Sequence, residues 1–302
     1  EEALAWLDEA LKAHPGGAEA HNGRGEILWD EGGVEEALHE FERAASADPK
    51  FTAAPLNRAE LLIVELGEFE RVLQFCDELL AGRTELPRPY RTFQAEIYYL
   101  KSKALFYLDD LEGALFLVRR AIKAGGDQPV YRAFVGQILF ELGSFDESRR
   151  VLDQAVALDP DTPHAVDHLA LAMERQGEEG CEGAFARAHA LDPNHYPLPR
   201  DISEEAFQRA VDEAIGNLPR SIREYVDNVP VLIEDMPALD MVQGENVSPQ
   251  ILGLVLGVPR TEAGPSHQPS DLDRVMIFKR NLEKVCRDDE ELIEQIQVTV
   301  RH

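Results

Sequence analysis

The chain repeats a pattern about every 34 residues, and this period restricts its possible folds more than any other feature. Pro15 and Pro49 lie 34 residues apart, and Pro160 and Pro193 lie 33 apart. A large apolar residue and an alanine stand eight and five residues before each proline, as the pairs Leu7/Ala10, Phe41/Ala44, Leu152/Ala155 and Phe185/Ala188. A fixed period of this length predicts an array of stacked units in place of a single closed core.

Each unit is predicted to be two helices joined by a short turn. Turn sequences occur at the expected places, namely Glu31-Gly32-Gly33, Leu66-Gly67, Leu108-Asp109-Asp110 and Leu142-Gly143. Small residues such as Gly25 and Gly136 let the two helices approach closely, and proline ends the second helix. One helix pair leaves its apolar stripe uncovered, so neighbouring pairs must stack. We divide the array into a half unit at 1–17 and units at 18–51, 53–87, 95–128, 129–161 and 162–195.

This pattern resembles the tetratricopeptide repeat, a helix–turn–helix unit of the same length. The resemblance implies a mostly α-helical solenoid over residues 1–195, wound as a right-handed superhelix. It also implies a concave face lined by the first helix of each unit. In this family that face binds an extended peptide or a partner helix, so we expect a protein or peptide partner.

Four residues are candidates for contact with such a partner. Asn22 and Asn57 occupy the same position in successive units, and an amide both donates and accepts hydrogen bonds, as a peptide backbone does. Their alternative role is that of solvated polar side chains. Trp29 and Tyr99 are expected on the same inner helices, where they form an aromatic floor or belong to the core. The lysines of the tetratricopeptide carboxylate clamp have no counterpart near the asparagines, which disfavours an acidic C-terminal tail as the ligand.

The composition is strongly acidic, with 57 Asp and Glu against 30 Lys and Arg and a net charge of −27. Such a surface disfavours nucleic acid and anionic membranes as partners, because binding phosphate requires basic groups. It favours a basic or neutral polypeptide, although the charge could serve solubility alone. The sequence contains no long apolar run and no secretory signal pattern, so we expect no membrane span and a cytoplasmic location.

The cysteines and two of the histidines give weaker signals. Cys76, Cys181 and Cys286 form no CxxC pair and are predicted to be buried apolar side chains in a reducing compartment. His164 and His168 lie four residues apart on a predicted helix, the spacing of two metal ligands on one face. No glutamate follows His164 and no third ligand is near in sequence, so we expect satisfied or solvated histidines.

Beyond Pro193 the pattern changes to that of a small α/β domain at 203–302, after a linker at 196–202. Ser203 is expected to begin a helix that runs to about Asn217. Asp288 and Glu291 have the spacing of a capping box for a final helix. Between these helices we predict a short helix near 219, strands at 229–235 and 275–279, and an apolar helical turn at 251–258.

Three segments of this region follow one another as EEAFQRAVDEAIGNLPRSIREYVDNVPVLIEDMP, ILGLVLGVPRTE and RVMIFKRNLEKVCRDDEELIEQIQVTVRH. In order and spacing they resemble a small bacterial family of zincin-like metallopeptidases, in which a final helix carries HExxH directly after a segment like VTVRH. The resemblance implies that His302 is the first zinc ligand, and that a glutamate following it acts as general base. It also implies that strand 275–279 lies beside this helix and pairs with the substrate.

The leading hypothesis is a cytosolic bacterial zinc metallopeptidase, a hydrolase whose solenoid recruits or regulates a substrate or partner. The sequence shown holds one metal ligand and no general base, so we expect zinc and activity only in the full-length protein. The alternative is a non-catalytic adaptor that binds a peptide or protein in the groove near Asn22 and Asn57. A third possibility is autoinhibition, with the linker or another segment lying in that groove.

Overall fold

The computed structural model describes residues 2–81, 90–226, 229–256 and 274–301. The chain forms two compact units, residues 1–138 and 139–302, and helix α8 spans the division between them. The structure is mostly helical with one small sheet near the C-terminal end, which confirms the predicted fold class. The predicted domain limits at 195 and 203 stay predictions.

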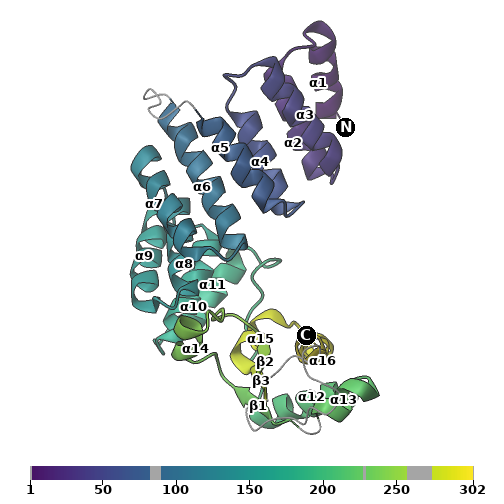
Figure 1. Ribbon diagram of the computed structural model, residues 1–302, viewed down its shortest axis with the longest axis vertical. Helices are drawn as coiled ribbons and strands as arrows, with labels where there is room; N and C mark the ends of the chain where they lie inside the picture. The colour runs from purple at the N-terminus through teal and green to yellow at the C-terminus, as the bar shows by residue number, and fades with distance from the viewer. Residues whose placement is uncertain (1, 82–89, 227–228, 257–273, 302) are drawn as a thin grey trace. The chain divides into compact units, whose positions relative to one another are not determined.

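The first unit is built from successive helix pairs, which Figure 1 shows side by side in purple to teal. Their bounds are α1 (Glu2–Ala13), α2 (Ala18–Asp30), α3 (Val34–Ala47), α4 (Ala53–Val64), α5 (Phe69–Leu80), α6 (Arg91–Tyr107), α7 (Leu111–Gly125) and α8 (Pro129–Glu141). Helices α2 to α5 lie within the predicted units at 18–51 and 53–87, whereas α6 begins at Arg91, before the predicted unit at 95–128. The α2–α3 and α6–α7 turns reverse the chain through Gly32 and Asp109, whose φ angles are 82° and 63°. This left-handed backbone explains the glycine and aspartate in the turn sequences.

Close approach within a pair depends on small residues, as the α2–α3 crossing shows. Phe41 of α3 is fully buried and lies against Gly25 of α2. A Cβ atom at position 25 would lie 2.7 Å from Cε1 of that ring. Phe41, the large apolar residue of this repeat, therefore packs into the space that Gly25 leaves open.

The second unit joins the last helix pairs to the C-terminal domain. After α8 its helices and strands are α9 (Phe145–Leu158), α10 (Pro163–Arg175), α11 (Cys181–Leu191), α12 (Glu204–Gly216), α13 (Arg220–Val226), β1 (Val231–Glu234), α14 (Leu239–Gly244), β2 (Gly253–Leu256), β3 (Arg274–Phe278), α15 (Lys279–Val285) and α16 (Asp289–Arg301). Ser203 caps α12 by accepting a hydrogen bond from the amide of Ala206, and Asp288 accepts from the amide of Glu291 at the start of α16. Both predicted helix starts are confirmed.

The sheet has the order β1–β3–β2, with β3 parallel to β1 and antiparallel to β2. Helices α12 and α16 pack together beside it, and one apolar cluster joins them to the sheet. The cluster includes Phe207 of α12, Ile277 of β3 and Ile296 of α16, all fully buried.

Two sequence predictions are wrong in this domain. The apolar segment 251–258 was expected to be a helical turn, but residues 253–256 form strand β2. Strand 275–279 was expected to present an edge to the substrate. Residues 275–277 of β3 are instead paired on both sides, with β1 and with β2, so this strand is central.

Within the described parts of the chain, no helix combines the length and hydropathy needed to cross a bilayer.

Candidate functional site

The inner helices of the first unit bring Asn22 and Asn57 into direct contact. The Asn57 amide donates to Asn22 Oδ1 at 3.1 Å and to Glu26 Oε1 at 2.9 Å. Asn22 donates to the same Glu26 oxygen at 2.9 Å. The shared register of the two asparagines thus places them together across α2 and α4. Glu26, which sequence reasoning missed, holds both amides in place.

Trp29 joins the same two helices further along. Its indole Nε1 donates to Glu65 Oε1 at 2.8 Å, and its ring makes an edge contact with Phe41 at 6.3 Å between centroids. The indole therefore contacts α3 through Phe41 and the end of α4 through Glu65.

Tyr99 lies in an aromatic cluster between α6 and α8. Its ring centroid is 5.2 Å from Tyr131 and 5.5 Å from Phe134, and burial raises the pKa of its hydroxyl above the usual value. The Tyr131 hydroxyl donates to Glu96 at 2.5 Å. Lys103 pairs with Glu60 on the neighbouring helix.

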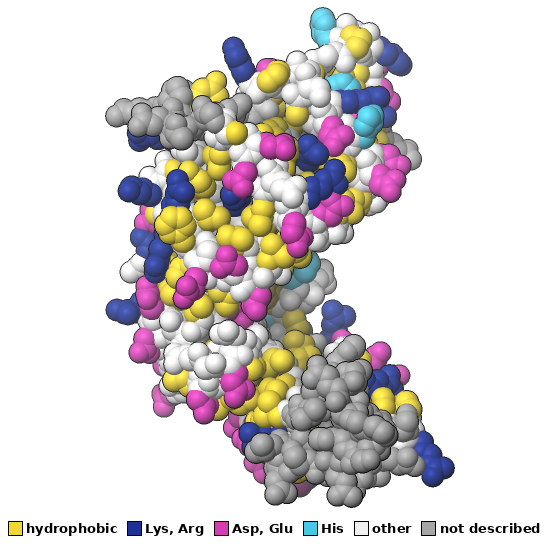
Figure 2. Space-filling view, in the orientation of Figure 1, with side chains coloured by type: hydrophobic (Ala, Val, Ile, Leu, Met, Phe, Trp, Pro, Cys, Tyr) yellow, Lys and Arg dark blue, Asp and Glu magenta, His cyan; other side chains and the backbone are white. Residues whose placement is uncertain are grey.

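Three carboxylates, Glu26 of α2, Glu65 at the end of α4 and Glu96 of α6, accept hydrogen bonds from neutral amide, indole and phenol donors. Figure 2 shows Asp and Glu side chains (magenta) among hydrophobic ones (yellow) over the visible face of the first unit. The net charge indicated that acidic side chains would be frequent. The fold shows which of these carboxylates accept hydrogen bonds from uncharged side chains.

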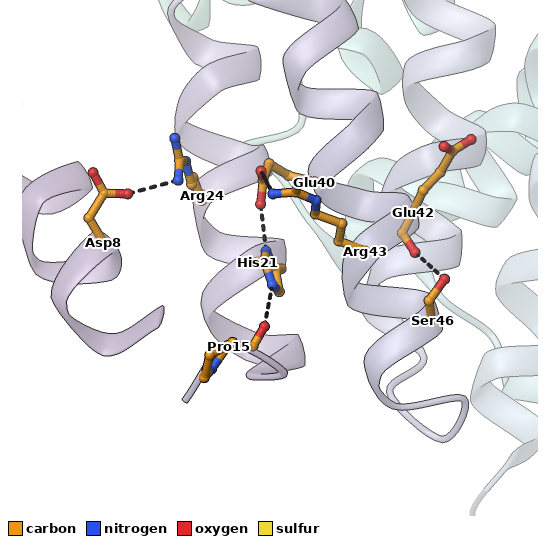
Figure 3. Close-up of polar contacts among 8 residues, drawn as sticks. All are labelled: Asp8, Pro15, His21, Arg24, Glu40, Glu42, Arg43 and Ser46. Atoms are coloured by element: carbon orange, nitrogen blue, oxygen red, sulfur yellow. Dashed lines mark hydrogen bonds and ion pairs between the residues drawn. The ribbon is translucent and has the colours of Figure 1, made fainter. Parts of the chain in front are cut away.

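The first helix pair also contains a polar network that sequence reasoning missed (Figure 3). His21 Nδ1 lies 2.6 Å from Glu40 Oε2, and its Nε2 lies 3.0 Å from the carbonyl oxygen of Pro15. Both side chains are buried. Arg24 pairs with Asp8 at 2.8 Å and so connects α1 to α2. This network ties α1, α2 and α3 together beside a cavity of about 650 Å³.

In the C-terminal domain, β2 is an edge strand of the described sheet and lies against α16. A Cβ atom at Gly253 would be 2.5 Å from the carbonyl oxygen of Met276 and 2.6 Å from Thr299 Cγ2, so only glycine fits between β3 and α16. Val298, one helical turn before position 302, is 40% exposed. His302 itself lies outside the described residues.

The described residues alone do not fit a catalytic zinc ion. They contain no group of three His, Cys, Asp or Glu side chains that could hold a metal. His164 and His168 stack with ring centroids 4.3 Å apart. His168 is buried, and burial and the neighbouring His164 hold its pKa well below the ordinary value. Its Nδ1 lies 3.1 Å from the carbonyl oxygen of His164, whereas its Nε2 has no hydrogen-bond partner among the described residues. The expectation of a satisfied ring is therefore met at one nitrogen of His168 and not at the other.

The three cysteines are free and buried, which confirms their apolar role. Burial raises the pKa of Cys76 to about 12 and that of Cys286 to about 11. These thiols are therefore poor nucleophiles at neutral pH.

The C-terminal domain is fixed to the last helix pairs by polar contacts within the second unit. Glu174 of α10 is buried and pairs with both Lys284 and Arg280 of α15. Glu141 accepts hydrogen bonds from Ser248 and Gln250 at 2.7 and 2.8 Å. Further contacts run from Arg175 to the carbonyl of Pro237 and from Gln243 to that of Gly143.

The segment predicted as a linker, residues 196–202, forms hydrogen bonds at both of its ends. The carbonyl oxygen of Tyr196 lies 2.9 Å from His189 Nδ1, and the amide of Arg200 donates to the carbonyl of Glu283 at 2.8 Å. The amide of Ile202 donates to the Glu283 carboxylate at 3.1 Å. The segment therefore packs against α11 and α15.

Comparison with known families and structures gives a result for each part of the chain. Residues 226–302 match a family described as zincin-like metallopeptidase, and residues 1–50 and 136–177 match two tetratricopeptide-repeat families. No curated protein sequence matches the chain.

Among solved structures, yeast Tom70 is 20% identical with a TM-score of 0.51, covering 62% of this chain and 39% of that one. PilF of Pseudomonas aeruginosa is 14% identical with a TM-score of 0.50, covering 62% and 82%. YrrB, described as a tetratricopeptide-repeat protein with an unusual peptide-binding site, is 17% identical with a TM-score of 0.41, covering 63% and 93%. At these identities the likeness concerns the fold.

Proposed function

Because the chain carries tetratricopeptide repeats followed by a zincin-like metallopeptidase domain, we propose that it belongs to a zinc-dependent metallopeptidase whose repeats recruit or regulate a polypeptide substrate or partner. The observation that carries the proposal is the family match over 226–302, which runs from the end of α13 through α16. We further propose repeats at 1–195, a connecting segment at 196–202 and a peptidase domain at 203–302, in a bacterial, cytoplasmic protein.

The arrangement of β2 and α16 supports the catalytic part. Zincins bind an extended substrate along an edge strand beside the metal-binding helix, and here β2 has that place instead of β3. His302 is the proposed first zinc ligand. Zinc, when bound, supplies a Lewis acid and a water of lowered pKa. The described residues supply the edge strand and the packed core that supports α16.

The inner helices of the first unit support the recruiting part. The Asn22–Asn57–Glu26 contact and the Trp29–Glu65 contact place polar groups and an aromatic ring on successive inner helices. We propose that Asn22, Asn57, Trp29 and Tyr99 contact a peptide or protein partner.

The test uses a protein in which the natural sequence continues beyond His302. Zinc content is measured by atomic spectroscopy, and peptide hydrolysis is measured before and after chelation. We expect close to one zinc per chain, hydrolysis that chelation abolishes, and loss of both in His302→Ala. His14→Ala, at an exposed position of the first unit, is the matched control. A full-length protein that binds no zinc would contradict the proposal.

A non-catalytic adaptor is the second candidate, and the contacts of Glu174 and Glu141 favour it. These contacts fix the C-terminal domain on the last helix pairs, as a structural cap of the solenoid requires. An adaptor is expected to retain its partner in His302→Ala and to lose it in the Asn22→Ala/Asn57→Ala double variant. Hydrolysis by the full-length protein would rule out a purely non-catalytic role.

A further inference from the structure

A cavity of about 320 Å³ lies inside the second unit, between the last helix pair, the segment that follows it and α15. Leu171 of α10, Phe185 of α11 and Val285 of α15 line it with apolar groups. Leu171 and Phe185 also belong to the core of the helix pairs, so their positions are fixed by packing. This volume is at the small end of ligand pockets and suits one side chain or a small molecule.

The carboxylate of Asp167 also lines this cavity. Its side chain is 21% exposed, and its nearest ionisable contact is His168 Nδ1 at 3.9 Å, which is too long for a hydrogen bond. No hydrogen bond to this carboxylate is present in the described part of the chain. The nearest buried cation, Lys284, also lines the cavity; its ammonium pairs with Glu174 and attracts the Asp167 carboxylate from beyond ion-pair distance. Asp167 is thus a largely buried acid that has no hydrogen-bonded counter-ion among the described residues.

A carboxylate in such a place is costly, because burial removes water that the charged form needs. Burial raises the pKa of Asp167 to about 6, so the group is still mostly ionised at neutral pH. A cation that entered the cavity would supply a hydrogen-bonded counter-ion to Asp167 while the apolar walls covered its stem. Lys284 and Arg287 line the same cavity and disfavour a second positive charge on the ligand.

We propose that this cavity binds a single primary ammonium group on an aliphatic stem, with Asp167 as its counter-ion and Leu171, Phe185 and Val285 along the stem. A lysine side chain of a partner polypeptide and a free alkylamine share this chemistry. The site is separate from β2 and α16, and the proposal does not depend on peptidase activity.

The experiment titrates the chain with three probes and follows binding by calorimetry. The probes are butylamine, a blocked Gly-Lys-Gly peptide and the same peptide with norleucine, which keeps the stem and removes the charge. We expect the lysine peptide to bind at least about tenfold more tightly than the norleucine peptide, because a hydrogen bond between charged groups is strong. Binding of butylamine as well supports a free amine as ligand, and binding of the peptide alone supports a protein-borne lysine. Equal affinity for lysine and norleucine peptides, or no binding of either cation, overturns the proposal.

Variants of the cavity give the matched comparison. Asp167→Asn keeps the shape, removes the charge and is expected to weaken binding of the lysine peptide at least about tenfold. Glu182→Gln, an exposed acid of α11 outside the cavity lining, is expected to leave binding unchanged. Val285→Ala shortens an exposed part of the wall and should weaken binding about threefold. Unchanged affinity in Asp167→Asn contradicts the proposal, and thermal melting confirms that each variant is folded.

The affinity of the cavity for the lysine peptide should also fall when the pH is lowered. Lowering the pH from about 7.5 to about 5 protonates Asp167, because its pKa is about 6, and so removes the counter-ion. The groups that face Asp167 are His168 and Glu174 on its own helix, Lys284 on α15 and Tyr196 on the connecting segment. Affinity that is the same at both pH values, or rises at about pH 5, contradicts the assignment of Asp167 as counter-ion.

Discussion

Individual side chains of this protein place polar groups where little water reaches them, and the His21–Glu40 contact of the first unit is one case. Both ring nitrogens of His21 contact oxygen acceptors, Glu40 and the carbonyl of Pro15. The ring therefore links Glu40 of α3 to the α1–α2 turn through two contacts, in a place where solvent does not compete with them.

The Glu40→Gln variant is expected to lower the free energy of unfolding of the first unit by about 1–3 kcal/mol, since it disturbs a buried hydrogen bond. A double-mutant cycle with His21→Gln should give a coupling energy of about 1–3 kcal/mol by denaturant unfolding. Arg43→Gln is the control, because Arg43 contacts the same Glu40 from the exposed side and should contribute less than about 1 kcal/mol. A coupling energy near zero contradicts the buried pair.

Asp167 gives the opposite case, a charge whose burial lowers stability. Its pKa is raised from 3.8 to about 6, so the folded state binds the proton more tightly than the unfolded state. Stability is therefore lost as the pH rises through about 6. We expect Asp167→Asn to raise the free energy of unfolding by about 1–3 kcal/mol at about pH 7.5, with the gain vanishing near pH 4. Denaturant unfolding across this pH range measures it, and a destabilised variant at neutral pH contradicts it.

At the scale of the elements, helix crossings depend on small residues, and α2 offers a matched pair of glycines. Gly25→Ala places a Cβ atom 2.7 Å from the ring of Phe41, so it should destabilise the first unit by about 1–3 kcal/mol. Gly23→Ala places its Cβ 3.7 Å from Leu7, an ordinary contact, and should stabilise by about 0.5–1 kcal/mol through helix propensity. Thermal unfolding of both variants tests the crossing, and equal effects contradict it.

The elements also show what the sequence could and could not predict. The repeat period placed the solenoid helices well, because proline and glycine mark their ends. The segment ILGLVLGV was misassigned, because a short apolar run has the same pattern in a buried strand and in a buried helix. The order of the strands in the sheet could not be predicted from the sequence either. Whether β3 is a central strand depends on its pairing with β1 and β2, which no local sequence pattern encodes. Of the candidate site, the contact between Asn22 and Asn57 follows from their register, whereas Glu26 and Asp167 depend on tertiary packing that no local pattern contains.

In the molecule as a whole, the C-terminal domain and the last helix pair of the second unit share a buried ionic network. Glu174→Gln leaves Lys284 and Arg280 with one counter-charge fewer, and should destabilise the second unit by about 3–5 kcal/mol. Adding Lys284→Met should recover part of this loss, because it removes an uncompensated charge. Hydrogen exchange of α15 amides measures both effects, with Glu179→Gln at an exposed position as control. Unchanged exchange in Glu174→Gln contradicts a shared network.

The contacts of Glu174 also bear on how such a protein can evolve. Solenoids lengthen when genes duplicate whole repeats, and each new copy must find an open end on which to stack. Here α15 already packs against the last helix pair: its Lys284 pairs with Glu174 of α10, and its Val285 lines the cavity beside Leu171. We therefore expect duplicated repeats to be accepted upstream of α10, and recombination that transfers the C-terminal domain to another gene to preserve its fold when α10 and α11 are carried with it.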